Sequence, residues 1–399
     1  MKSALWPLAL AACLVTATAG AQTPVSDPLW GDGRVSDFYT WSEAIPSTPG
    51  VPLRKEPLPT PLGLAGAGAQ FRVLYGSTSG VDGKTPVAVS GAVFVPKGEA
   101  PAEGWPIVAW AHGTVGVADA LAPSWHGRSY RDVQYLNAWL NAGFAVVATD
   151  YEGLGVAGLH PYMDMRSEAY SVLDSVRAAL KNIPLLSNRI VIVGQSQGAG
   201  AAFATAGFAP QYAPDLHILG TVATGVPYPT SDVRAAAQFY DQKGPLGSYM
   251  LYTVLTAMEA SPGLKASDVL TDKALPLLDL ARIKHIALLQ ADIDSVGLTW
   301  ADSFKPGGLA KIWGRKAAEY PTFKLQQPLF VGSGTIDLMA PPQMQRRLVQ
   351  DACKAGTIVE VHLYPGLGHD ETVNASLKDS IPFVRKLLAG QPIAPICEP

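Results

Sequence analysis

Cysteine is scarce in this sequence, with 3 residues in 399, and only 16% of the residues are charged. No basic run is present and the formal net charge is -3, so we expect no nucleic-acid partner. No spacing of cysteine and histidine suggests a zinc site, no internal repeat is visible, and no metal or cofactor is expected. The apolar run at the N-terminus is too short to span a membrane. The composition is that of a globular protein, and the chain is long enough for one large α/β domain or two smaller ones.

Residues 1–21 have the pattern of a cleavable export signal. An early lysine precedes an apolar stretch that ends in small residues, which predicts a cut after Ala21 and a secreted or periplasmic protein. The alternative is a lipoprotein box, "LAAC", that would leave Cys13 lipidated. Ordinary cleavage discards Cys13, and we then expect Cys353 and Cys397 to form a disulfide; two unrelated thiols are the alternative.

The rest of the chain alternates strand and helix patterns. Residues 22–66 are rich in Pro, Gly and Ser and are predicted to be an irregular arm. Residues 67–227 and 324–399 hold eight strand candidates, the later of which are continuous apolar runs with helical patterns between them. This order predicts a mostly parallel α/β sheet with helices on both faces. A turn at Asp82-Gly83 predicts an antiparallel hairpin at one edge. Residues 228–323 are helical and apolar, and we interpret them as an inserted cap over the active-site mouth.

The segment Gly194-Gln195-Ser196-Gln197-Gly198 fits the pattern G-x-S-x-G. An apolar strand precedes it and a helix of small residues follows, which is the context that a nucleophile elbow requires. Such a turn exposes a serine oxygen at the top of the sheet, so Ser196 is the candidate nucleophile. The alternative is a glycine-rich loop without catalysis.

A serine hydroxyl needs a base within hydrogen-bond reach and an acid that orients this base. His369 is the candidate base, because it lies in a glycine-rich loop directly after the last strand candidate. Asp337 follows the preceding strand and is the candidate acid, in the chain order Ser, acid, His. Asp370 is the rival acid, but a neighbouring residue rarely reaches the far ring nitrogen of a histidine.

The oxyanion that forms during attack needs backbone donors. One is expected to be the amide of Gln197, and the other is expected in the loop after strand "IVAWA", with Thr114 as donor. Gly113 lets this backbone approach the substrate. Tyr151 follows the next strand and is a candidate for substrate contact; holding the oxyanion loop and packing in the core are its alternatives.

Long stretches of the chain resemble one known family. "AHGTVGVADALAPS", "LNAWLNAGFAVVATDYEGLG", "HPYMDMRSEAYSVLDSVRAA" and "GQSQGAGAA" are similar to the secretory lipase family of the α/β-hydrolase fold, in its bacterial branch. The resemblance covers most of the chain beyond residue 66. It implies an exported ester hydrolase with Ser196, Asp337 and His369 as its triad. The chain departs from the family at two positions: members of the family often have His in the position of Gln195 and Gly in the position of Ala199.

Together these patterns predict an exported serine hydrolase that cleaves carboxylic esters through an acyl-enzyme. Its expected partner is a small-molecule or lipid ester, with transient contact to a lipid interface and no obligate protein partner. A peptidase or acyltransferase on the same triad is an alternative, because the fold supports many reactions. A catalytically silent protein whose apolar cap binds a partner is the alternative from another class.

Overall fold

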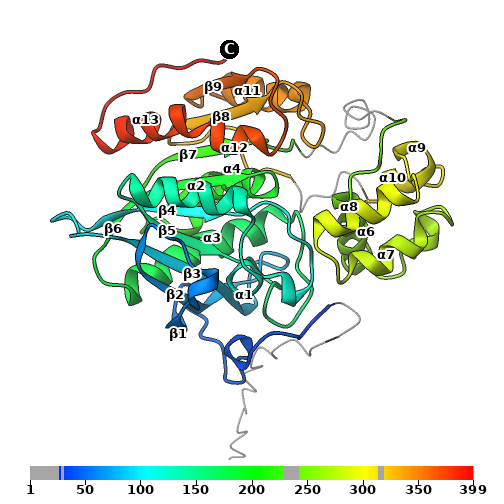
Figure 1. Ribbon diagram of the computed structural model, residues 1–399, viewed down its shortest axis with the longest axis horizontal. Helices are drawn as coiled ribbons and strands as arrows, with labels where there is room; N and C mark the ends of the chain where they lie inside the picture. The colour runs from blue at the N-terminus through cyan, green and yellow to red at the C-terminus, as the bar shows by residue number, and fades with distance from the viewer. Residues whose placement is uncertain (1–26, 28–30, 229–241, 313–318, 399) are drawn as a thin grey trace, which may run out of the picture.

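The structure is a computed structural model that describes residues 27, 31–228, 242–312 and 319–398 (Figure 1). The predicted signal peptide and Cys13 therefore lie outside the described residues, as do 229–241 and 313–318 of the predicted cap. Within the described ranges no helix is both long enough and apolar enough to cross a membrane.

A single sheet of nine strands forms the centre of the fold, in the order β1-β2-β3-β5-β4-β6-β7-β8-β9. The first three strands of this order pair antiparallel, as do β3 and β5, and every pair from β5 to β9 is parallel. Parallel strands bring their carboxyl ends to one edge, where binding sites form. The strands are β1 Pro52–Pro57, β2 Ala67–Thr78, β3 Pro86–Pro96, β4 Trp105–Ala111, β5 Ala145–Thr149, β6 Leu186–Gln195, β7 Ile218–Thr224, β8 Leu329–Gly334 and β9 Val359–Tyr364.

The count of eight strands was one too few, because β1 lies in the segment predicted to be an irregular arm. Its prolines, Pro52 and Pro57, stand at its two ends, and it pairs only with β2. Proline is tolerated on an edge strand, where an N–H can be missing without loss of a ladder bond. The predicted hairpin between β2 and β3 is confirmed, and its turn is held by Asp82 Oδ1, which accepts from the amides of Lys84 and Thr85 at 2.9 Å each.

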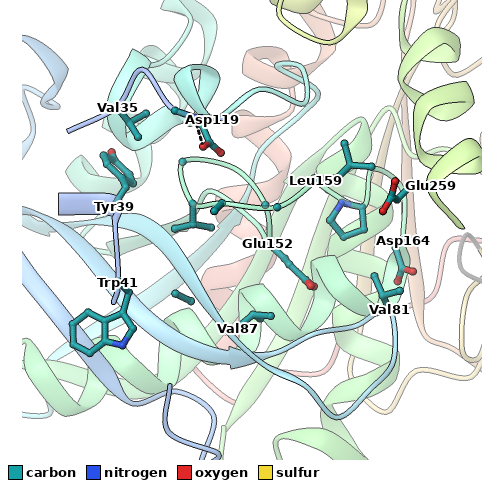
Figure 2. Close-up of a pocket in the computed structure, with 18 of the residues that line it drawn as sticks. Val35, Tyr39, Trp41, Val81, Val87, Asp119, Glu152, Leu159, Asp164 and Glu259 are labelled. Atoms are coloured by element: carbon teal, nitrogen blue, oxygen red, sulfur yellow. Dashed lines mark hydrogen bonds between the residues drawn. The ribbon is translucent and has the colours of Figure 1, made fainter. Parts of the chain in front are cut away.

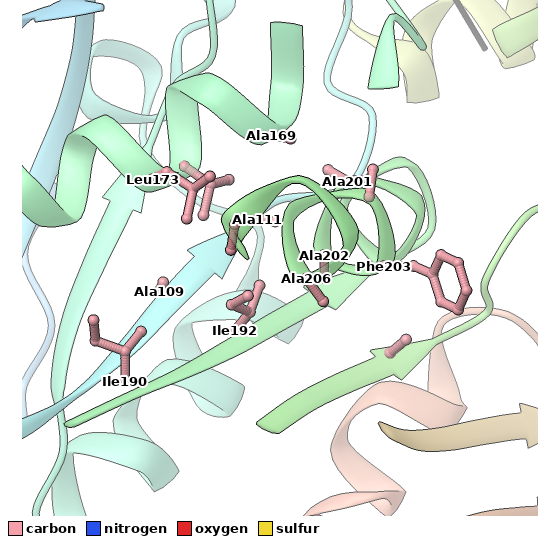
Figure 3. Close-up of a cluster of buried hydrophobic side chains, with 14 of the residues drawn as sticks. Ala109, Ala111, Ala169, Leu173, Ile190, Ile192, Ala201, Ala202, Phe203 and Ala206 are labelled. Carbon is pink, nitrogen blue, oxygen red and sulfur yellow. The ribbon is translucent and has the colours of Figure 1, made fainter. Parts of the chain in front are cut away.

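Two hydrophobic layers cover the faces of the sheet. Along β4, Ile107 and Ala109 pack on one face and Val108 and Trp110 on the other, as the two-residue period of a strand requires. Figure 3 shows the first layer, in which alanines of α4 lie close against the strands. This layer is made by α3 Met165–Asn182, α4 Gln197–Tyr212 and α11 Pro342–Ala355; α2 Tyr130–Asn141 and α13 Leu377–Leu388 cover the other face.

Between β7 and β8 the described residues include five α-helices, which form a separate group at one side of the sheet (Figure 1). They share a hydrophobic cluster of their own, which includes Leu251, Leu255 and Leu289, and which reaches the core through Val117 and Tyr162. These helices fall within residues 228–323, and the interpretation of that segment as a cap over the active site stays a prediction. The helices are α6 Tyr249–Ala260, α7 Leu275–Ala281, α8 Ile286–Ser295, α9 Trp300–Ser303 and α10 Gly308–Ile312.

The predicted disulfide between Cys353 and Cys397 is confirmed, with Cα atoms 6.2 Å apart. It ties the C-terminal tail to α11. Beside it, Ile396 pairs with β9, since its amide donates to Val359 O at 2.7 Å and its carbonyl accepts from Val361 N at 3.1 Å.

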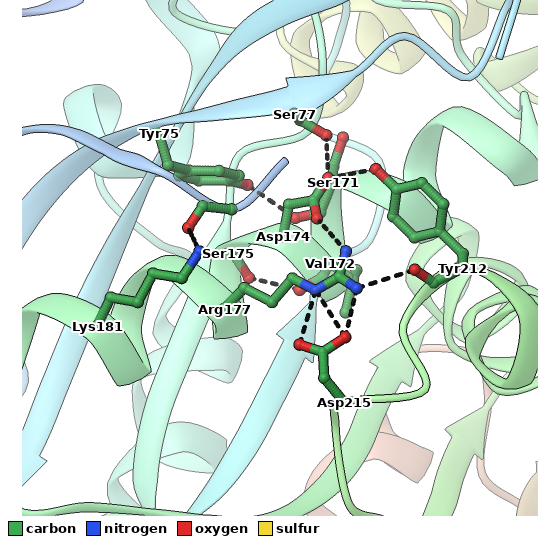
Figure 4. Close-up of polar contacts among 11 residues, drawn as sticks. Tyr75, Ser77, Ser171, Val172, Asp174, Ser175, Arg177, Lys181, Tyr212 and Asp215 are labelled. Atoms are coloured by element: carbon green, nitrogen blue, oxygen red, sulfur yellow. Dashed lines mark hydrogen bonds and ion pairs between the residues drawn. The ribbon is translucent and has the colours of Figure 1, made fainter. Parts of the chain in front are cut away.

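Helix α3 is fixed to the sheet by a buried carboxylate (Figure 4). Asp174 accepts from Ser77 of β2 at 2.7 Å, from Tyr212 at 2.6 Å and from Arg177 at 3.1 Å. Arg177 also pairs with Asp215. Because these partners come from β2, from α3 and from the end of α4, the group fixes the position of α3 against both elements.

Candidate active site

Ser196 lies between the end of β6 and the start of α4, with backbone angles φ 57° and ψ -122°. This left-handed conformation costs a non-glycine residue about 1–3 kcal/mol. A side chain at Gly194 would overlap the carbonyl oxygen of Gly198, and one at Gly198 would overlap that of Ala111. Both glycines of the motif are therefore required by the close approach of strand and helix, in the predicted strand-turn-helix context.

Asp337 and His369 meet beyond the carboxyl ends of β8 and β9. His369 Nδ1 lies 2.8 Å from Asp337 Oδ2. The carboxylate is 2% exposed and accepts further bonds from the amides of Met339 and Ala340 at 2.9 and 2.8 Å and from Gln345 Nε2 at 3.1 Å. These donors fix the orientation of the Asp337 carboxylate as an acceptor for the imidazole.

The other ring nitrogen of His369 is the one that a serine base must use. Among the described residues His369 Nε2 is buried without a hydrogen-bond partner. Ser196, Asp337 and His369 line the same cavity. With Nδ1 donating to the carboxylate, Nε2 is the acceptor, which is the tautomer that takes a proton from a serine.

The rival acid, Asp370, points elsewhere. Its carboxylate forms an ion pair with Arg131, near the start of α2. Arg131 also donates to Asp132 Oδ1 at 2.9 Å and to Gln195 Oε1 at 3.0 Å. Arg131 therefore joins the loop that carries His369 to the strand end that carries Ser196.

Of the two predicted oxyanion residues, Thr114 lines the cavity, whereas Gln197 is buried directly after Ser196 and is not among the lining residues. Gly113 also lines the cavity, and Thr114 Oγ1 lies 2.8 Å from the hydroxyl of Tyr162. Gln197 is the first residue of α4, so its amide is one of the four that have no acceptor within the helix. A side chain at Gly113 would overlap Gln195 Oε1, so glycine is needed where the loop passes the elbow.

The prediction of substrate contact for Tyr151 is wrong in this structure. Tyr151 is fully buried and is not among the cavity residues. Its hydroxyl donates to the carbonyl of His112 at 3.0 Å, and the two rings lie 4.4 Å apart. It therefore supports the loop that leads to Thr114, which was one of the alternatives.

The cavity that Ser196 lines has a volume of about 1150 Å³. It lies between the carboxyl ends of the parallel strands and the helices after β7. Its walls differ in chemistry. Ile286 and Trp300 line it from these helices and Leu246 from the segment just before α6, whereas Arg128 and Arg131 line it from the side of α2. A cavity of this size accommodates an ester larger than a few carbon atoms.

A second cavity, of about 530 Å³, lies between the N-terminal segment and the loop after β5 (Figure 2). Tyr39, Trp41, Asp119 and Glu152 are among its lining residues. None of the three candidate triad residues lines it. In the described ranges no three His, Cys, Asp or Glu side chains gather in a way that could hold a metal.

Three residues near the site were missed from the sequence. Arg131 is one, and the others are Glu168 and His160, whose side chains contact that of Gln197. Both occur in the stretch "HPYMDMRSEAYSVLDSVRAA", but their spacing to each other and to Ser196 gave no sign of a shared contact. Their burial could be anticipated only from the helical pattern of the segment.

Residues 129–266 match the family model described as Secretory lipase. The chain is 24% identical to Lipase A of Moesziomyces aphidis over 406 residues, which cover 95% of this chain and 83% of that protein. A stretch of 92 residues is 35% identical to Lipase 7 of Candida albicans and covers 22% of this chain and 21% of that protein. The resemblance predicted from the motifs is confirmed.

Solved structures share the fold. Lipase A of Candida antarctica in its closed state has a TM-score of 0.70 at 21% identity, over 96% of this chain and 90% of that chain. The rice cell wall degrading esterase LipA from Xanthomonas oryzae has a TM-score of 0.67 at 19% identity, over 86% of this chain and 100% of that chain. The predicted α/β-hydrolase class is confirmed, with nine strands in place of eight.

Proposed function

We propose that this chain, a carboxylic ester hydrolase similar to the secretory lipases, reacts through an acyl-enzyme on Ser196. One observation carries the proposal. His369 Nδ1 lies 2.8 Å from Asp337 Oδ2, and His369 Nε2 is buried with no partner in the part of the chain that the structure describes, in a cavity that the strained Ser196 also lines. A nucleophile, a base and an orienting acid are the parts that acyl transfer requires.

In the proposed mechanism His369 Nε2 takes the proton of Ser196 as the serine oxygen attacks the ester carbonyl. Asp337 stabilises the imidazolium that forms, and His369 then gives its proton to the leaving alcohol. Water repeats the cycle on the acyl-enzyme and releases the carboxylic acid. The amides of Gln197 and Thr114 stabilise the negative oxygen of each tetrahedral intermediate, and one such donor is worth about 10²–10³ in kcat.

The substrates proposed are esters with an apolar acyl group, including lipid esters. The similarity to secretory lipases supports this class of substrate. Leu246, Ile286 and Trp300 form an apolar wall, which supports binding of the acyl chain on the side of the cavity that faces the helices after β7. Exposed Ile336 and Leu338, 60% and 84% accessible, flank Asp337 at the cavity. They support transient contact with a lipid interface at the mouth.

The test is hydrolysis of p-nitrophenyl esters from acetate to palmitate by the mature protein and by four variants. Ser196→Ala and His369→Ala are expected to lose at least about 10³-fold in kcat, and Asp337→Asn about 10⁴-fold. Asp370→Asn is the matched control, since its carboxylate pairs with Arg131, and it is expected to keep kcat within about threefold. Full activity of Ser196→Ala would overturn the proposal, and a larger loss in Asp370→Asn than in Asp337→Asn would reassign the acid.

We further propose that the protein is exported and that cleavage follows Ala21, so that the mature chain begins at Gln22. The family and the disulfide between Cys353 and Cys397 support an oxidising destination. Intact mass of the protein recovered after export measures the cut directly. A lipidated N-terminal Cys13 would instead add the mass of acyl chains and establish the alternative.

A further inference from the structure

The side chain of Gln197, the residue after Ser196, is buried and bonded on two sides. Its Nε2 donates to Glu168 Oε1 at 2.8 Å and lies 3.0 Å from His160 Nε2. Gln197, Glu168 and His160 are 3%, 0% and 1% exposed. Both hydrogens of the Gln197 amide group are therefore used by buried partners, one from α3 and one from the loop between β5 and α3.

His160 is neutral in this arrangement, because one of its ring nitrogens faces a hydrogen-bond acceptor and the other faces a donor. Nδ1 lies 2.8 Å from the carbonyl oxygen of Glu152, which can only accept, so Nδ1 carries the proton. Nε2 faces the amide nitrogen of Gln197, which can only donate, so Nε2 carries none. Burial also lowers the pKa of His160 to about 3.

Glu168 is neutral for a related reason. Its Oε1 accepts from Gln197 and from the amide of Met163 at 3.0 Å, whereas its Oε2 is buried with no partner in the described part of the chain. Burial, against the opposing hydrogen bonds from Gln197 and Met163 and with a smaller contribution from Asp164, raises the pKa of Glu168 to about 8. The titratable groups around Glu168 are Asp164 at the N-cap of α3, His160 and Tyr151 in the loop after β5, and Tyr320 before β8. None of them supplies a positive charge that would balance an ionised carboxylate.

A column of rings connects this group to the other side of the oxyanion hole. The ring of Tyr151 stacks on His160 at 5.8 Å and contacts His112 at 4.4 Å. The Tyr151 hydroxyl donates to the carbonyl of His112, two residues before Thr114. The loop of Thr114 and the side chain of Gln197 are thus fixed to one buried support.

We propose that Glu168 and His160 are positioning residues for the oxyanion hole, which as two neutral partners hold Gln197 while Tyr151 ties them to the loop of Thr114. The inference rests on the proposed function, because it takes the amides of Gln197 and Thr114 as the donors. Neutrality is required, since a carboxylate charge behind Gln197 would repel the negative oxygen that this amide stabilises.

The experiment compares Glu168→Gln with Glu168→Leu on p-nitrophenyl butyrate between pH 6 and pH 9.5. Gln is the neutral isostere and keeps an oxygen that accepts from Gln197, so its kcat at pH 7 is expected within about threefold of wild type. Leu removes this acceptor, and kcat is expected to fall by about 10- to 100-fold with KM changed less than threefold. The wild-type kcat is expected to fall above pH 8 as Glu168 ionises, and that of Glu168→Gln is expected to stay level.

Asp174→Asn is the matched control, because Asp174 is the other fully buried acid of α3 and contacts no residue of the oxyanion hole (Figure 4). It is expected to lower Tm without changing kcat more than threefold. If Glu168→Leu does not fold, His160→Phe keeps the stacked ring, removes the acceptor Nε2, and is expected to lower kcat by about tenfold.

Two results would overturn the inference. One is wild-type kcat in folded Glu168→Leu or His160→Phe, and the other is a loss in Glu168→Gln as large as in Glu168→Leu, which would mean that the charge is needed. Ser196→Ala in the same series distinguishes failure of the proposed function from failure of the positioning role. Full activity of Ser196→Ala would reject the proposed function itself. An inactive Ser196→Ala together with unaffected Glu168 variants would reject only the positioning role.

Discussion

Arg131 is the residue that connects the separate loops of the active site. Its guanidinium bonds Gln195 beside the nucleophile and pairs with Asp370 beside the base. We expect Arg131→Ala to lower kcat by about tenfold, because a small displacement of a positioned group costs rate without unfolding the chain. Steady-state kinetics with Arg347→Ala as control measures this effect. Arg347 forms an exposed pair with Asp351, worth a few tenths of a kcal/mol, and equal kcat losses in both variants would contradict the prediction.

The residues of the candidate triad could be proposed from sequence because each directly follows a strand and their order along the chain is constrained by the fold. Arg131, His160 and Glu168 could not. Arg131 is separated from Gln195 by 64 residues and Glu168 from Gln197 by 29, and no local pattern encodes either contact. The chemistry of a site is therefore easier to predict than the residues that hold it in place.

At the scale of elements, the disulfide between Cys353 and Cys397 closes a segment of 44 residues that contains β9 and α13. In the chain-entropy account such a closure stabilises the fold by up to about 4 kcal/mol. We expect the double variant Cys353→Ser and Cys397→Ser to unfold at lower urea concentration with unchanged kcat, since neither cysteine lines the cavity. Unfolding curves with and without reductant measure it, and a midpoint that reductant leaves unchanged in the wild type would contradict it.

The element that sequence patterns did not predict was β1. Its residues, "PLRKEP", lack an apolar run, because an edge strand needs few buried side chains and is held mainly by its backbone bonds to β2. The central strands β4 and β6 were predicted because both of their faces are buried, which requires continuous apolar residues.

At the scale of the whole molecule, two buried acids make stability depend on pH in an unusual direction. Burial raises the pKa of Glu168 and of Asp119 to about 8 each, whereas both ionise near pH 4 in an unfolded chain. Their contribution to folding stability is therefore complete below about pH 4 and is lost as the pH rises toward 8.

We accordingly expect Glu168→Gln and Asp119→Asn to gain in Tm relative to wild type as the pH increases from 5 to 8, because the variants have no proton to lose. Asp215→Asn should behave in the opposite way. Hydrogen bonds from Arg177 lower the pKa of Asp215, so the wild-type residue stabilises the fold at neutral pH and loses this advantage on acidification. Thermal melts at four pH values check both signs, and a pH-independent difference in Tm would refute them.

The position of Ile396 beside β9 has a consequence for the behaviour of the protein while its cysteines are reduced. Paired with Val359 and Val361, the tail occupies hydrogen-bonding groups at the end of the sheet that would otherwise be open. An open edge is a template on which strands of other chains can assemble. Because the disulfide at the neighbouring Cys397 holds this tail in place, oxidation also protects the protein against edge-to-edge aggregation, and molecules that remain reduced are the ones exposed to it.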